Sequence, residues 1–212
     1  MLLERFQDLD IHRVTTPHEI AQFEPGFVAA YRHIFAGEPY FEDFTDQEVV
    51  ATWRRLTRVR NNITLIAADA EGVVQGFAIA IPLSEAPDAA RELNGLLPLR
   101  ATMYLVELGV GEAWRGRRLG KHLVKLRIQL TDPNLFSHVV LRVAEGRTAT
   151  FEMYRSLDFT DMGVSMMEPA AHRRLDQKRH ALLHVEGPEP GPIRRVARAC
   201  AASAPRRGRR RA

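Results

Sequence analysis

The chain has 212 residues, of which 45% are hydrophobic, enough for a folded core and too many for wholesale disorder. No apolar run approaches the ~20 residues of a membrane-spanning helix, and the first residues lack the basic-then-apolar layout of a secretory signal. The single cysteine, Cys200, excludes a disulfide within the chain. We therefore expect a cytoplasmic protein without a membrane segment.

The net charge of +4 is unevenly distributed. Residues 188–212 carry eight arginines and one acid, a charge of +7, which leaves residues 1–187 at −3. The Pro-rich and Arg-rich composition of residues 188–212 has no core-forming pattern, so we predict one folded domain over residues 1–187 and a disordered tail over residues 188–212. Through such a tail the protein would bind nucleic acid at most non-specifically.

Helical and strand spacings of apolar residues alternate along the body of the chain, and no internal repeat is visible. Pro25-Gly26 is expected to break or kink the first helix, and Thr45 or Asp46 to cap the second. In chain order the predicted elements are a strand at 11–14, a helix from 17, a helix over 49–56, a hairpin of 63–67 and 73–81, a short helix within 89–97, a buried strand at 103–110, a helix at 119–130, a strand at 139–143, a helix at 150–157, and strands at 160–167 and 181–185.

The most informative segment runs from Val110 to Lys121, as a strand end, a basic turn and a helix start. A helix start presents unpaired N–H groups and the positive end of the helix dipole, and Gly116 and Gly120 allow close approach to the backbone. Positive side chains are added by Arg115, Arg117, Arg118 and Lys121. Together these features predict a pyrophosphate site, although a solvated basic helix start would have the same composition.

This segment resembles the signature of the GNAT N-acetyltransferase superfamily, Arg/Gln-x-x-Gly-x-Gly/Ala between the fourth strand and third helix of that fold. Arg115 matches its first position and Gly120 its last, whereas Arg118 stands in place of a glycine. A second family pattern, Asn-x-x-Ala-x-x-Leu-Tyr-x-x-x-Gly-Phe, is matched at Tyr154 and Phe159. It is not matched at Arg147, Thr150 and Asp158.

The resemblance implies an α/β fold with a mixed, mostly antiparallel central sheet, flanked by helices and splayed between its fourth and fifth strands. It also implies direct transfer of an acetyl group from acetyl-CoA to an amine, with no metal and with a homodimer as an open alternative. Contacts to acetyl-CoA are then expected from Leu108, Val110, Arg115, Gly116, Arg117, Arg118, Leu119, Gly120 and Lys121.

Two residues are candidates for proton transfer. The resemblance makes Tyr154 the acid that protonates the departing thiolate, and the alternative is an aromatic residue that only packs. Glu107 lies in an apolar strand, where a carboxylate is costly unless it is paired or lines a cleft. It could accept the proton of the amine or pair with a nearby arginine. His180 and His184 have a metal-like spacing, but no third ligand is evident.

Acidic and aromatic residues concentrate between the first two helices, a connection that related enzymes use as a wall of the acceptor site. We expect Glu38, Tyr40, Glu42 and Asp43 to bind a small polar, cationic amine of the polyamine or aminoglycoside kind. A solvated loop is the alternative for this segment. The alternatives for the function are a peptide or lysine acetyltransferase, and an inactive GNAT scaffold that binds nucleic acid through its basic tail.

Overall fold

The structure is a computed structural model that describes residues 1–38, 40–144, 148–167 and 179–188. Apart from residue 188, the predicted tail lies outside the described residues, as does Arg147. The strands are β1 (Leu2–Phe6), β2 (Leu9–Val14), β3 (Ile63–Ala68), β4 (Val74–Pro82), β5 (Thr102–Val110), β6 (His138–Ala144), β7 (Thr160–Met167) and β8 (Arg179–Glu186). The α-helices are α1 (Pro17–Ala36), α2 (Asp46–Thr57), α3 (Pro87–Leu93), α4 (Leu119–Leu130) and α5 (Ala149–Arg155).

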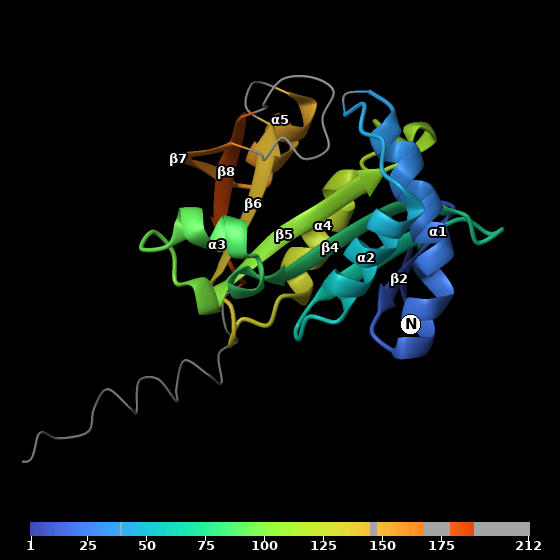
Figure 1. Cartoon of the computed structure of the whole chain (residues 1–212), viewed down its shortest axis with the longest axis horizontal. Helices are drawn as coiled ribbons and strands as arrows, with labels where there is room; N and C mark the ends of the chain where they lie inside the picture. Colours follow the sequence, from blue (N-terminus) through green and yellow to red (C-terminus); the bar gives the residue numbers. More distant parts are fainter. Residues whose placement is uncertain (39, 145–147, 168–178, 189–212) are drawn as a thin grey trace, which may run out of the picture.

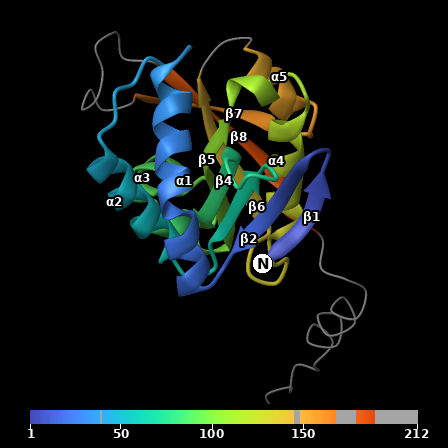
Figure 2. The ribbon, with the colours of Figure 1, turned by 90° about the vertical axis from the view of Figure 1, so that its right-hand side faces the viewer.

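One mixed sheet organises the described part of the chain, in the order β1-β2-β3-β4-β5-β6-β8-β7. Helices α1 and α2 cover one face and α4 the other (Figure 1, Figure 2). The core under α1 and α2 is centred on aromatic rings, with Phe27 4.5 Å from Trp53 and 4.8 Å from Phe77 between ring centroids. No helix of the described residues is both long and apolar enough to cross a membrane.

The sheet opens between β5 and β6. These strands pair in parallel only from Thr102↔His138 to Leu105↔Leu141, whereas β5 continues to Val110 and stays paired with β4 on its other edge. The end of β5 therefore leaves the ladder with β6. Counted from β2, these are the fourth and fifth strands, so the predicted α/β fold and its splay are confirmed.

The predicted helices and strands are present, with two differences. Helix α1 is not broken at Pro25, and Thr16 caps it in a capping box with Glu19. Gly26 instead allows close packing, because a Cβ there would lie 2.8 Å from Cγ2 of Val74 on β4. Strand β1 was not predicted, since it lies at one edge of the sheet, paired with β2, and its pattern of exposure does not alternate.

At two positions where the family patterns have glycine, this chain has another residue and its backbone is left-handed. Arg118, which precedes α4, has φ 67°, and Asp158, which follows α5, has φ 65°. A residue with a Cβ is strained in this region, whereas glycine is not. Arg118 and Asp158 thus adopt the left-handed turn at a cost in conformational free energy that glycine would not have.

Replacing Arg118 with glycine should leave the protein more stable than replacing it with alanine, by about 1 kcal/mol. Both changes remove the side chain, but only glycine reaches a positive φ without a Cβ penalty. At Lys125, which is exposed within α4, the same pair should rank in the opposite order, because glycine costs about 1 kcal/mol in a helix interior. Urea unfolding of the four variants measures both differences. Equal stability of the two Arg118 variants would contradict the left-handed turn.

Candidate active site

The turn after β5 presents backbone donors at the start of α4. Gly116 has φ 75° and Arg118 is the N-cap, so the N–H groups of Leu119, Gly120 and Lys121 have no carbonyl within the helix to bind. A Cβ on Gly120 would lie 3.5 Å from Cγ2 of Val110, an ordinary contact. The turn therefore offers free amides and the positive end of the α4 dipole to an anion.

Three of the four cationic side chains predicted to bind phosphate are held by other parts of the protein. The Arg115 guanidinium donates to the main-chain oxygen of Glu38 at 3.1 Å, and that of Arg117 lies 5.0 Å from the ring centroid of Trp114. Lys121 Nζ donates to Ser156 Oγ at 2.8 Å. Arg118 is exposed at the tip of the turn. The backbone amides are thus the fixed part of the site, and the side chains frame it.

Glu107 lies on β5 just beyond the last residue paired with β6. Burial raises the pKa of its carboxyl to about 7, against the opposing charges of Arg142 and Arg55, while the carboxylate of Glu42 adds to the rise. Tyr31 of α1 lies close to it, and burial followed by the Glu107 carboxylate raises the pKa of the Tyr31 hydroxyl. A carboxyl with such a pKa is poised to exchange a proton near neutral pH.

Tyr154 of α5 is 5% exposed, and its ring packs edge-on against Phe159 at 5.5 Å. Burial raises the pKa of its hydroxyl, and the nearby Arg127 guanidinium opposes that rise. At neutral pH the phenol is therefore protonated, the form that a general acid requires.

Sequence reasoning missed Arg127 and Tyr31. Arg127 follows Leu123 by four residues and Leu119 by eight, so it lies on the apolar stripe that α4 turns to the sheet. This position was the available signal, because a charged residue on a buried stripe needs a partner. Tyr31 lay on the predicted apolar face of the first helix, where a core role was the simpler interpretation.

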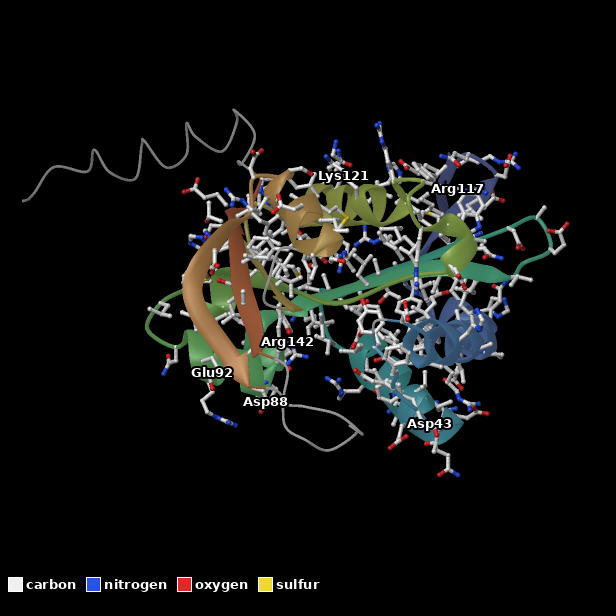
Figure 3. All side chains as sticks on the ribbon, turned by 90° about the horizontal axis from the view of Figure 1, so that it is seen from above. Asp43, Asp88, Glu92, Arg117, Lys121 and Arg142 are labelled. Atoms are coloured by element: carbon white, nitrogen blue, oxygen red, sulfur yellow. The ribbon has the colours of Figure 1, made fainter. Side chains whose placement is uncertain are left out.

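The four residues predicted to bind the acceptor differ in burial and in the groups that they contact. Tyr40 packs on Phe35 at 4.8 Å, and burial raises the pKa of its hydroxyl. Glu42 is partly buried and acts electrostatically on both Glu107 and Tyr31. Glu38 is exposed at the rim and is met by Arg115 through its main chain. Asp43 is exposed beside α2, away from the sheet (Figure 3).

A pocket of about 440 Å³ lies between the end of α1 and the turn after β5. Its lining residues are His33, Ile34, Ala36, Gly37, Glu38, Glu112 and Arg115. It includes neither Glu107 nor Tyr154, the two candidates for proton transfer. The described residues contain no group of three His, Cys, Asp or Glu side chains that could hold a metal ion.

Comparisons with known proteins agree with this geometry. The sequence profile of the Acetyltransferase (GNAT) family matches residues 27–159. A search of curated proteins gave no match. Among solved structures, a ribosomal-protein-alanine N-acetyltransferase from Brucella melitensis superposes with a TM-score of 0.61 at 17% identity, covering 83% of this chain and 98% of its own.

Two further structures show the same fold. An N-acetyltransferase from Staphylococcus aureus gives a TM-score of 0.60 at 13% identity, with 83% of this chain and 98% of its own covered. A GCN5-related N-acetyltransferase from Kribbella flavida gives a TM-score of 0.55 at 22% identity, with 85% of this chain and 98% of its own covered. At these identities the likeness concerns the fold, while the profile match spans more than half of the sequence. The chain therefore belongs to the GNAT acetyltransferase family, whose acetyl donor is acetyl-CoA.

Proposed function

We propose that this protein transfers the acetyl group of acetyl-CoA directly to a primary amine of a small polar acceptor that arrives as an ammonium ion. The observation that carries the proposal is the placement of two proton-transfer groups of opposite character at the splay. Glu107, with its pKa raised to about 7, lies on β5, and the protonated phenol of Tyr154 lies beside Arg127 of α4.

The donor fits the α4 side of the sheet. The first amides of α4 would bind the pyrophosphate, with Arg118 adding charge at the exposed tip. Leu108 and Val110 pack on the α4 side of β5, where their backbone would guide the pantetheine arm and thioester. In Figure 3, Arg117 and Lys121 lie on this side, whereas Arg142 and Asp43 lie on the other. The acceptor would enter from that opposite side.

The proposed reaction balances with these two groups. The Glu107 carboxylate takes one proton from the ammonium ion, and the free amine nitrogen attacks the thioester carbonyl. A C–N bond forms and the C–S bond breaks, while Tyr154 gives its proton to the departing sulfur. The second N–H proton returns to Tyr154 through solvent. Near neutral pH the Tyr154 phenol is protonated and a substantial fraction of Glu107 is ionised, as these steps require.

Tyr154→Phe should lower kcat by ~10²–10⁴ while the protein stays folded, the usual range for loss of a general acid. The ring and its contact with Phe159 remain, so packing changes little. Steady-state release of CoA measures the rate, and circular dichroism checks the fold. A kcat close to that of the wild type would make Tyr154 a packing residue.

Glu107→Gln should remove the acidic limb of the pH profile. Since the carboxyl accepts a proton only above its pKa of about 7, wild-type kcat/KM should rise with pH through that value. In the variant only the ionisation of the amine itself should remain, so the defect shrinks once free amine is abundant. Measurement of kcat/KM across pH decides this. An unchanged acidic limb in the variant would deny Glu107 the role of base.

The same substitution should stabilise the protein at alkaline pH. The folded pKa of Glu107 lies above the ordinary 4.5, so folding favours the protonated form, and this contribution is lost as pH rises through about 7. The amide introduced by Glu107→Gln carries no charge at any pH, so unfolding at about pH 8 should show a gain of roughly 1–3 kcal/mol over the wild type. A difference between the two proteins that stays constant from pH 5 to pH 8 would contradict the raised pKa.

Glu42→Gln should raise the KM for a cationic amine, whereas Asp43→Asn should not. Both changes remove one negative charge from neighbouring positions, but only Glu42 is partly buried and coupled to Glu107. The KM for acetyl-CoA should stay the same in both variants. A panel of monoamines, polyamines and aminoglycosides, assayed by CoA release, supplies the acceptor. Equal KM values in the two variants would favour the alternative interpretation, in which this segment is a solvated loop without a role in acceptor binding.

A further inference from the structure

Arg127 is a fully buried charge in the middle of an otherwise apolar helix face. Its exposure is 0%, and its neighbours on the stripe include Leu123 and Leu119, both also at 0%. Burial lowers the pKa of its guanidinium to about 10, while Tyr154 and then the carboxyl of Glu107 oppose that shift. The group is therefore charged at neutral pH. Burial of a charge is expensive unless hydrogen bonds and opposite charges offset it.

Only part of the guanidinium is used to hold the fold. Nη1 donates to the main-chain oxygen of Ile79 at 3.0 Å and to that of Glu107 at 2.9 Å. These two residues face each other across β4 and β5, next to a shift in register between Ile79 and Ile81. Nε and Nη2 are buried and have no hydrogen-bond partner among the described residues. One nitrogen thus anchors the group, and two donors remain.

The Tyr154 side chain lies close enough to the guanidinium for the two groups to interact. The two side chains interact through charge, and this interaction favours the ionised form of the phenol against the effect of burial. Because Nε and Nη2 lack a well-formed hydrogen bond, the contribution that counts is the nearby positive charge. In a buried setting such a charge acts strongly, since little water screens it.

We propose that Arg127 is a positioning residue for acetyl transfer, which holds a fixed positive charge beside the Tyr154 hydroxyl and makes that phenol a stronger acid toward the departing thiolate. The proposal rests on the proposed role of Tyr154. The bonds to Ile79 and Glu107 fix the guanidinium to the strand that also carries the base. The charge then stabilises the negative oxygen that Tyr154 develops as it gives up its proton.

A purely structural role predicts something different. A brace between β4 and β5 would need the bonds to the two main-chain oxygens but no relation to Tyr154. Its removal would loosen β5 and impair the enzyme to the same degree whether or not Tyr154 has a hydroxyl. The proposal predicts instead that the effect of Arg127 on rate passes through that hydroxyl.

A double-mutant cycle separates the two roles. Arg127→Met, which keeps the length and removes the charge, is made in the wild type and in Tyr154→Phe, and kcat is measured by CoA release with acetyl-CoA and an accepted amine. We expect kcat to fall by at least about tenfold in the wild type and by less than about twofold in Tyr154→Phe, with little change in KM for acetyl-CoA. Arg127→Lys, which keeps a charge, should restore part of the loss.

Equal losses of kcat in the two backgrounds would overturn the proposal and leave Arg127 as a brace. If Arg127→Met does not fold, the cycle is run with Arg127→Gln, which also lacks the charge but can still donate to the two main-chain oxygens, and equal losses in the two backgrounds would overturn the proposal. Circular dichroism and melting curves verify the fold of each variant. A Tyr154→Phe enzyme with wild-type kcat would defeat the proposed role of Tyr154, an outcome that the single variant shows before any Arg127 variant is made.

Discussion

The loss of pairing between β5 and β6 is the constraint on which the rest of this site depends. After Leu105↔Leu141 the two parallel strands diverge, yet β5 continues, held on its other edge by β4 as far as Gly76↔Val110. A strand edge that leaves its partner exposes main-chain donors and acceptors that must find other bonds. In this protein the exposed stretch carries Glu107, Leu108 and Val110, so the open ladder is also where the thioester would lie.

Close packing of the two strands that remain paired keeps this edge in place. Gly109 faces the ring of Phe77, and a Cβ there would come within 2.3 Å of Phe77 Cζ. The ring also joins the aromatic core of Phe27 and Tyr31. The position of the β5 end is therefore set by the core under α1 and α2, and Tyr31 links that core to Glu107. Packing and the proposed proton transfer therefore depend on neighbouring residues of one core.

Much of the fold could be predicted from the sequence, because apolar spacing and capping residues act locally. Thr45 caps α2 together with Glu48, as its position before an amphipathic run suggested. What could not be predicted depends on contacts distant in sequence. Pro25 suggested a broken helix, since nothing local indicated that Gly26 packs on β4.

The candidate site shows the same division. Candidates named from family positions, such as Tyr154, needed only a motif, and their roles stay predictions. The difference between Glu42 and Asp43 arises from the path of the loop, which turns one carboxylate toward Glu107 and the other to solvent. The buried charge of Arg127 is explained by the main-chain carbonyl groups of β4 and β5 that accept its hydrogen bonds, and these neighbours are distant in sequence.

The contacts between α4 and α5 connect the two sequence patterns physically. At the start of α4, Lys121 Nζ donates a hydrogen bond to Ser156 Oγ. A Cβ on Gly120 would lie 3.6 Å from the sulfur of Met153, an ordinary van der Waals contact. Two turns further along, Arg127 meets Tyr154. The helix proposed to present amides to phosphate thus also carries the charge beside the phenol, so donor binding and thiolate protonation would depend on one packed pair of helices. Glu107 and Glu42 lie on the other side, with α1 and its loop. In the proposed arrangement strand β5 is the wall common to both sides, with the donor on the α4 side and the acceptor on the α1 side.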